Sequence, residues 1–343
     1  MEKETKYGVL SDIHENPKIL PYALDALKKE GAEMLIVNGD IGTIADNLED
    51  SQRFTAYILD NIAKTGIESY IQPGSHETIG AFESVLDYFK EKNKNIIDVK
   101  ENPKIDSNNH SLIFLPGSDW NVSGGEYTLT DNNIETGFYH IPQKQGPDQY
   151  RYYKNMNDLE KQLTEPEKTI AVSHIPRKFN NIENCVDVAE FGEIQKDFFA
   201  DIVNYEDGEQ QIRVYEKNGE NGTIVKPKPV KEFIRNQSFE KGGIFPSEIA
   251  KYFQSFGAPI EIKKENRGNE SLKNLYEKSG ITKAVSGHFH ESGHRANDSK
   301  GNHVEPGKYT NELFWNSGYL DVGQTGILKV KDNKVSYDNI QLR

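Results

Sequence analysis

Short apolar runs alternate with longer amphipathic segments along the N-terminal part of the chain. Three of the runs have the length and composition of buried strands: residues 7–10, 34–37 and 68–71. Three segments that follow them repeat apolar residues at helical spacing: residues 22–30, 47–64 and 81–92. Strands that alternate with helices in this order predict a parallel sheet with right-handed crossovers.

Further apolar runs predict a second group of strands, at residues 96–99, 111–115, 170–172 and 284–285. Helical spacing returns at residues 155–163 and 272–278. Three runs near the C-terminus predict antiparallel strands that close a second sheet: residues 313–316, 326–330 and 335–337. The Gly- and Tyr-rich stretch 121–153 has the length of a binding loop, and we interpret it either as a wall of a substrate cleft or as a surface excursion.

The composition adds an acidic surface to this picture. The net charge of −13 disfavours loose binding of nucleic acid or anionic membrane over the whole surface. No stretch approaches the roughly 20 apolar residues of a membrane span, and no apolar run follows the charged residues 1–6, so we expect neither a membrane anchor nor a signal peptide. The single cysteine, Cys185, excludes an intramolecular disulfide and fits a cytoplasmic location.

Side chains suited to chemistry stand where the predicted strands end. The apolar runs are followed by carboxylates or imidazoles: Asp12 and His14, Asp40, His76 and Glu77, His174, and His288 with His290. In α/β sheets, ligands bind outside the carboxyl ends of the strands. The sequence therefore predicts one metal site built from five strand ends. Alternation along a strand predicts that His288 and His290 point to the same side.

These residue types suit divalent metal ions. Neutral imidazole and carboxylate ligands favour Zn, Mn, Fe, Co or Ni. Two such ions roughly 3.5–4 Å apart need a bridging ligand, which a carboxylate with two oxygens supplies. Such a pair clamps the attacking and leaving oxygens of an in-line displacement at phosphorus, and it lowers the pKa of a bound water toward about 7.

The order of the motifs resembles that of the calcineurin-like metallophosphoesterases. It runs Asp12-Ile13-His14, Gly39-Asp40, Gly74-Ser75-His76-Glu77, His174 and Gly287-His288-Phe289-His290. The resemblance covers residues 5–120 and 168–343, and the ordered set of motifs is far more specific than any one of them. It implies a four-layer α/β/β/α sandwich of two mixed sheets with flanking helices.

The resemblance also implies a role for each matching residue. The ligands divide into two sets that share one bridging carboxylate: Asp12, His14 and His290 for the first ion, His174 and His288 for the second, and Asp40 between them. A metal-bridging hydroxide then attacks phosphorus, and His76 protonates the leaving oxygen or hydrogen-bonds to it. The implied cofactors are two divalent ions, with manganese, iron, zinc, nickel and cobalt all left open.

One position departs from the family pattern. The family usually carries Asn before the acid histidine, and its amide oxygen binds the second ion, whereas this chain carries Ser75. A hydroxyl is a poorer neutral ligand, so Ser75 either binds the second ion weakly or acts through water. Three more residues are candidates for supporting or substrate-binding roles: Glu77, which would orient His76, Asp46, and Arg177, which reaches a substrate phosphate or forms a surface ion pair.

Residues 178–279 exceed what the family core needs. We expect them to form an inserted subdomain that selects the substrate, with residues 1–177 and 280–343 as the core. Within this insertion, the apolar spacing predicts helices at 191–199 and 245–256, and glycines predict hairpins around 208 and 219–222.

Two classes of function remain open from the sequence. The first is a phosphoester hydrolase, in which a phosphodiesterase acting on a nucleotide, a nucleic acid or a lipid headgroup is favoured over a phosphomonoesterase. The second is a metal-bearing interaction protein that docks through the insertion. His76 favours the enzyme, because non-catalytic members of the family typically lose this histidine.

Overall fold

The computed structural model describes most of the chain, in two compact units. The described residues are 4–42, 48–77, 79–107, 109–118, 129–130, 133–134, 138–141, 149–152, 163–204, 210–216, 224–225 and 237–343. One unit, termed the core unit, comprises Met1–Val188 and Asn266–Arg343; the other, the inserted unit, comprises Ala189–Glu265. The predicted insertion, residues 178–279, contains the inserted unit and extends beyond it at both ends.

The core unit contains a six-stranded sheet in the order β23-β22-β1-β2-β3-β4. Its strands are β1 (Thr5–Leu10), β2 (Met34–Asn38), β3 (Glu68–Gln72), β4 (Ile96–Asp98), β22 (Gln324–Lys331) and β23 (Lys334–Gln341). Strands β1 to β4 are parallel, which confirms the prediction from the alternating strands and helices. Strands β22 and β23 extend the sheet in antiparallel fashion from the edge of β1.

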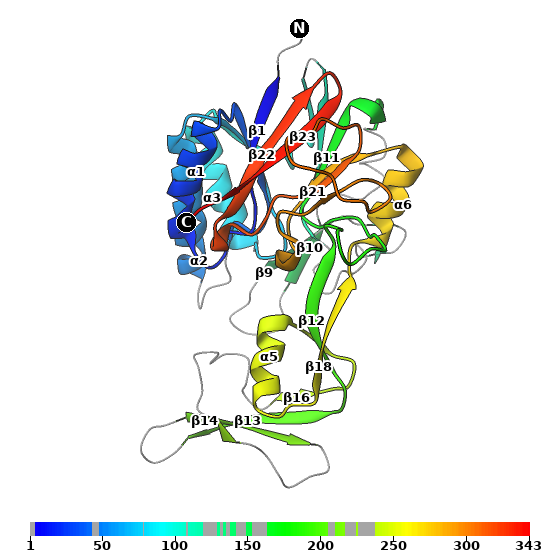
Figure 1. Ribbon diagram of the computed structural model, residues 1–343. Coiled ribbons are helices and arrows are strands. Elements are labelled where there is room, and N and C mark those ends of the chain that lie inside the picture. Colours follow the sequence, from blue (N-terminus) through cyan, green and yellow to red (C-terminus); the bar gives the residue numbers. More distant parts are fainter. Residues whose placement is uncertain are drawn as a thin grey trace. The chain divides into compact units, whose positions relative to one another are not determined.

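Three helices cover the outer face of this first sheet (Figure 1). They are α1 (Leu20–Lys29), α2 (Leu48–Lys64) and α3 (Ile79–Lys92), close to the predicted positions. Their apolar faces form one buried cluster with strand residues such as Leu35, Val37 and Ile71. Because this cluster holds the helices against the strands, the opposite face of the sheet is left to pack on the second sheet.

The second sheet has the strand order β20-β21-β19-β11-β6-β5. Its strands are β5 (Lys104–Asp106), β6 (Ser111–Leu115), β11 (Thr169–Ser173), β19 (Lys283–Ser286), β20 (Ala296–Asn297) and β21 (Leu313–Asn316). The four central strands are parallel and the two edge strands are antiparallel. A buried cluster joins the two sheets, with Tyr7 and Ile36 from the first packed among residues such as Phe114 and Trp315 of the second.

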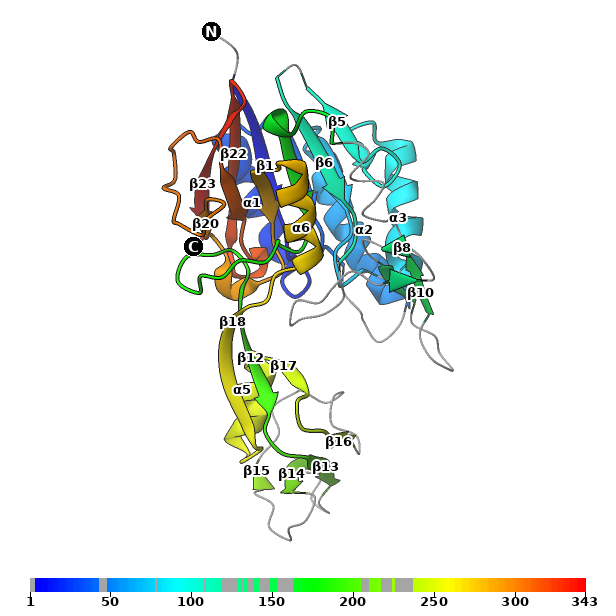
Figure 2. The ribbon, with the colours of Figure 1, turned by 90° about the vertical axis from the view of Figure 1, so that its right-hand side faces the viewer.

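Helix α6 (Glu270–Ser279) covers the outer face of the second sheet, as Figure 2 shows. Its Leu272 and Tyr276 belong to a buried cluster with Ala171 and Phe314 of the sheet. Phe179 and Val186 join the same cluster. The layers are therefore helices, sheet, sheet and helix, which is the predicted α/β/β/α sandwich.

The prediction for the C-terminal strands is wrong in its pairing. Strand β21 runs parallel to β19 in the second sheet, whereas β22 and β23 belong to the first. Successive residues of β22 are buried on opposite faces, because Ile327 packs with the helices and Leu328 packs between the sheets. A strand with apolar residues on both faces must be covered on both sides. Pairing with β1 places β22 between the helices and the second sheet.

The inserted unit is built mainly from short antiparallel strands. Its elements, the first of which begins one residue before the unit, are β12 (Val188–Ile194), β13 (Phe198–Asn204), β14 (Gln210–Glu216), β15 (Ile224–Val225), β16 (Gln237–Phe239), β17 (Ile244–Pro246), α5 (Ser247–Ser255) and β18 (Ile260–Asn266). The helix expected at 191–199 is wrong, because Phe191 and Phe198 lie on two successive strands. Their helical spacing is produced by the bend between β12 and β13. The antiparallel pairs β13–β14 and β14–β15 match the two predicted hairpins.

The remaining described elements are short 3₁₀ helices and short strands. They are η1 (Pro17–Ile19), β7 (Leu129–Thr130), β8 (Asn133–Ile134), β9 (Phe138–Ile141), β10 (Gln149–Tyr152), η2 (Pro166–Lys168), η3 (His290–Ser292) and η4 (Leu320–Val322). Apart from these strands, the expected cleft wall at 121–153 lies outside the described residues, as does the expected helix at 155–163 except for its last residue. None of the helices that the structure describes is long and apolar enough to cross a membrane.

Candidate metal centre

The loops after five parallel strands bring the predicted ligands together. Three groups have ligand atoms within 4.8 Å of one another: Asp12, His14 and His290; Asp40, His174 and His288; and His14, Asp40 and His76. Parallel strands end at the same edge of a sheet, so side chains that directly follow them converge there. All the acidic and imidazole ligands expected from the motifs therefore lie in one cluster.

Three of these residues leave their strands through unusual backbone conformations. Asp12, Asp40 and His288 have φ angles of 57°, 50° and 69°. Positive φ is uncommon for residues with a Cβ and is concentrated at functional sites. This finding also corrects the alternation argument, because residues 287–290 do not continue the strand: His288 is left-handed and His290 begins a 3₁₀ turn. The two imidazoles consequently belong to different groups.

Glycines allow the loops to approach closely enough for the carboxylates to meet. Gly39 has a φ of 80°, and a Cβ there would lie 2.8 Å from both Gly74 N and His174 Nδ1. A Cβ on Gly287 would overlap Ser11 Oγ and the Asp12 carboxylate. No other residue type fits this approach without moving backbone or ligand atoms.

The His174 imidazole is the ionic centre of the second group. Its Nδ1–H donates to the carbonyl of Asn38 at 2.8 Å, which turns Nε2 toward the carboxylates. Nε2 lies 3.0 Å from Asp40 Oδ2 and 3.9 Å from Asp12 Oδ1. Burial opposes the cation, but the nearby Asp40 and Asp12 raise the pKa of His174 to about 10. In the metal-free protein, this imidazole is therefore charged.

The other groups respond to the same crowding of charge. Burial, with the neighbouring His76 as the next cause, lowers the pKa of His14 to about 3. Burial and the charge on His174 lower the pKa of His288 to about 3. Burial opposes ionisation of Asp40, yet His174 and His76 hold its pKa well below the usual range. His14 and His288 are therefore neutral beside an ionised Asp40, the forms in which these residues bind metal ions, whereas His174 must lose its proton to do so.

Orphaned nitrogens test whether a metal fits the cluster. Nε2 of His14 and Nε2 of His288 are buried and have no hydrogen-bond partner among the described residues, whereas Nε2 of His174 pairs with Asp40. Buried polar atoms are nearly always bonded, so two such nitrogens beside two carboxylates call for another partner. Imidazole nitrogens and carboxylate oxygens are the donors that divalent transition metals prefer. The described residues therefore form Asp/His clusters that could hold divalent metal ions.

The loop after β3 orients the Asp40 carboxylate. Ser75 donates to it from its backbone N–H and from Oγ, which lies 2.9 Å from Oδ2 and 3.2 Å from Oδ1. The His76 N–H adds a third donor, 2.9 Å from Oδ1. The Ser75 hydroxyl is thus bonded to Asp40, and its expected contact with the second ion, direct or through water, stays a prediction.

His76 is the most open imidazole of the cluster. Its side chain is 42% exposed, and its Nε2 lies 3.9 Å from Asp40 Oδ2. Its ring stacks on that of His14 with centroids 4.1 Å apart. His76 thus lies beside the carboxylates and is open to solvent.

The three supporting candidates have different positions. The carboxylate of Glu77 accepts the N–H groups of Ile41 at 2.5 Å and Gly74 at 2.7 Å, so it ties together the loops that carry Asp40 and His76. Arg177 is buried and pairs with Glu277 at 3.0 Å, which favours the ion-pair alternative over a phosphate contact. Asp46 lies outside the described residues.

Several further residues hold the ligand loops in place, and among them only Asn316, in the turn Asn316-Ser317-Gly318 that resembles one near the site in the family, was suggested by the sequence. Asn38 accepts from His174, as described above. The Asn316 amide donates to the carbonyls of Gly287 and Phe289, at 3.2 and 3.0 Å, on either side of His288. Both asparagines are the last residues of buried strands and stand one or two positions before a glycine, and this is the signal that marks them. No comparable signal marks Tyr319 and Asp321, which also contact the cluster.

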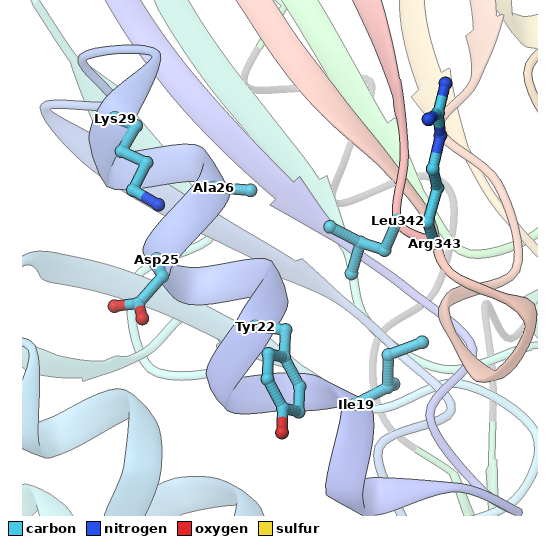
Figure 3. Close-up of a pocket in the computed structure, with 7 residues that line it drawn as sticks. All are labelled: Ile19, Tyr22, Asp25, Ala26, Lys29, Leu342 and Arg343. Atoms are coloured by element: carbon cyan, nitrogen blue, oxygen red, sulfur yellow. The ribbon is translucent and has the colours of Figure 1, made fainter.

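A pocket elsewhere on the core unit holds none of these residues. It is lined by residues of α1 and by Ile19, Leu342 and Arg343, and Figure 3 shows Ile19 and Ala26 pointing toward Leu342. The site that the strand ends build is therefore defined by its clustered ligands and not by this hollow.

Comparison with known proteins supports a single family. The calcineurin-like phosphoesterase family matches residues 5–205, which is more than half of the 343 residues. The chain belongs to the calcineurin-like phosphoesterase family, and its two mixed sheets with flanking helices have the fold of that family. No curated protein matches the chain.

Two solved structures match the chain at low sequence identity. TT1561 of Thermus thermophilus shares 9% identity over 98% of this chain and 99% of its own, with a TM-score of 0.48. A dimetal phosphatase from Danio rerio shares 10% identity over 99% of each chain, with a TM-score of 0.43.

Proposed function

We propose that this protein hydrolyses phosphoesters at a centre that holds two divalent metal ions. The observation that carries the proposal is the pair of adjacent Asp/His groups, in which the buried Nε2 atoms of His14 and His288 have no partner among the described residues. The first ion would be held by Asp12, His14 and His290, the second by His174 and His288, and Asp40 would bridge them. When bound, such ions neutralise phosphate oxygens and lower the pKa of a coordinated water.

The chain's own residues supply orientation and a proton. Asp40 is held by three donors from Ser75 and His76, so its carboxylate cannot rotate freely. Held in this way, the carboxylate is prepared for a bridging role before any ligand arrives. His76, half exposed beside it, is positioned to protonate the leaving oxygen or to hydrogen-bond to it.

Among phosphoesters, a diester such as a cyclic nucleotide, a nucleic acid or a lipid headgroup remains the favoured substrate class, and a monoester the alternative. The inserted unit is the proposed place of substrate selection, and manganese and a cytoplasmic location remain predictions. A non-catalytic scaffold that binds metal through the same residues is the competing function class.

Turnover with defined metals tests the proposal. Metal-stripped protein is given Mn²⁺, Ni²⁺, Zn²⁺, Fe²⁺, Co²⁺ or Mg²⁺, and hydrolysis of bis-p-nitrophenyl phosphate is compared with hydrolysis of p-nitrophenyl phosphate. We expect metal-dependent turnover, with the diester preferred. Two bound ions without turnover of either ester, under any metal, would favour the scaffold.

A further inference from the structure

A short turn from the C-terminal part of the core unit is bonded to the loop that carries Asp12 and His14. The Asp321 carboxylate, 8% exposed, accepts three successive backbone N–H groups of that loop. They come from His14 at 3.0 Å, Glu15 at 2.7 Å and Asn16 at 2.7 Å, residues 307 to 305 positions away in sequence. One carboxylate therefore sets the course of the backbone at and after His14.

The bonding is reciprocal. Leu320 N–H donates to the carbonyl of Ser11 at 3.2 Å, and Asp321 N–H donates to that of Asp12 at 3.3 Å. Asp12, whose carbonyl accepts one of these bonds, has a positive φ of 57°. Such a backbone conformation persists only where the surroundings over-determine it. The turn supplies part of that constraint, through main-chain bonds on both sides of the bend.

Tyr319, at the start of the same turn, contacts the imidazoles directly. Its ring lies parallel to that of His290, with centroids 3.6 Å apart and an angle of 7° between the planes. It also stacks at 5.7 Å on His14, and its hydroxyl donates to the Glu15 carboxylate at 3.0 Å. The phenol is thus fixed at one end by Glu15 while its face covers His290.

The contact with Tyr319 matters for His290 because the His290 side chain is less buried than that of His174. The His290 side chain is 34% exposed, whereas that of His174 is fully buried. Packing alone therefore restrains His290 less, and it lies on a single 3₁₀ turn, not on a strand. A flat ring against its face restricts the imidazole to orientations in which Nε2 stays near Asp12, at 3.5 Å from Oδ1.

We infer that the turn Tyr319–Asp321 is a positioning element for the Asp12, His14 and His290 group, with Asp321 setting His14 and Tyr319 setting His290. The inference rests on the proposed metal centre. It assigns no metal ligand to the turn itself. Groups that orient metal ligands typically affect metal affinity by 10- to 100-fold when they are lost.

The test measures Co²⁺ binding by calorimetry and by the visible absorption of the bound ion. A His288→Ala background removes a ligand of the second group and isolates the first, and a His290→Ala background does the reverse. Tyr319→Leu and Asp321→Ala are made in each background. Tyr319→Phe keeps the stacked ring and loses only the bond to Glu15.

Matched controls come from the same unit. Tyr309→Phe removes a hydroxyl bonded to Glu4, as Tyr319→Phe removes one bonded to Glu15. Asp298→Ala removes a carboxylate that accepts the N–H groups of Lys300 and Asn302, both at 2.9 Å. Both control residues bond to groups outside the ligand cluster, so neither substitution should change Co²⁺ binding.

In the His288→Ala background, Tyr319→Leu and Asp321→Ala should weaken Co²⁺ binding by about 10- to 100-fold and change its absorption spectrum. Tyr319→Phe should retain most of the affinity, and binding in the His290→Ala background should not change. Unaltered Co²⁺ affinity and spectrum in Tyr319→Leu, or equal losses in both backgrounds, would overturn the inference even if the melting temperature fell. Absence of Co²⁺ binding in the wild-type protein would instead refute the proposed metal centre, and the inference with it.

Discussion

Replacing Gly74 by alanine tests the close approach of the loops that hold Asp40. A Cβ added there would lie 2.6 Å from Asp40 N and 2.9 Å from His174 Cδ2, and it would overlap Asp40 Oδ1. These neighbours are backbone or buried side chains, so none can move aside cheaply. The backbone φ of Gly74 is not in the left-handed range, so the effect of the methyl group is steric.

The size of the effect follows from these distances. Ordinary contact for a Cβ begins at 3.4 Å, so the loop must retreat by about 1 Å to accept the methyl group. Overpacking of this kind costs about 1–3 kcal/mol of unfolding free energy. A misplacement of about 1 Å at a reacting centre lowers the rate on the order of 10²-fold. We therefore expect a modest loss of stability and a much larger loss of turnover.

Gly42→Ala is the matched control, because Gly42 lies two residues after Asp40 in the loop that follows β2. Its Cβ would meet Glu77 Cγ at 3.4 Å, an ordinary contact, and its φ is not left-handed either. A Gly→Ala change that the backbone tolerates stabilises a protein by about 0.4–1 kcal/mol, because the unfolded chain loses freedom. Gly42→Ala should therefore be as stable as the wild-type protein or slightly more so.

Urea denaturation of metal-stripped protein gives the unfolding free energies, and kcat/KM for bis-p-nitrophenyl phosphate gives the loss of function. If Gly74→Ala matched Gly42→Ala in both quantities, the steric account of this junction would be wrong. A fall in stability without a fall in kcat/KM would show that the loop adjusts without moving Asp40.

Three further experiments test other residues of the core unit: His76, His174 and Asp187. His76→Ala should lower kcat by about 10²- to 10⁴-fold with an unchanged metal content, because its imidazole serves the leaving group; wild-type rates on every phosphoester tried, including esters of weakly acidic alcohols, would exclude that role. Metal binding should release a proton from His174 at any pH below about 10, since the metal-free protein holds a cation where a ligand must be neutral. Calorimetry in two buffers of different ionisation enthalpy measures this proton, and equal binding enthalpies would contradict it. Asp187→Ala should lower the unfolding free energy by about 2–5 kcal/mol in urea titrations. The substitution removes the carboxylate that accepts the buried N–H groups of Phe179 and Gly268 and the Asn266 amide. A loss below about 1 kcal/mol would contradict this account and mean that water replaces the carboxylate.

Local patterns in the sequence were sufficient for the parallel half of the first sheet and for the identity of the clustered residues. Strand and helix periodicity depends on neighbours a few positions away, so the alternation up to α3 could be read directly. The ligand residues are of types that bind metal and stand at strand ends, and a parallel sheet necessarily gathers its strand ends. Motif order then supported the family, which the match over residues 5–205 shows.

Tertiary structure decided everything that depends on partners distant in sequence. Helical spacing at Phe191 and Phe198 could not reveal that a bend separates two strands, and no periodicity assigns β22 to the edge of β1. Asp321 lies 307 residues from His14, and nothing around it marks a carboxylate that accepts three backbone N–H groups. Hydrogen bonds of this kind are set by how the strands are ordered and how their loops meet, and neither is encoded in a short window of sequence. Local motifs therefore identify the residues of the site, whereas the hydrogen bonds that hold these residues in place are determined by the tertiary structure.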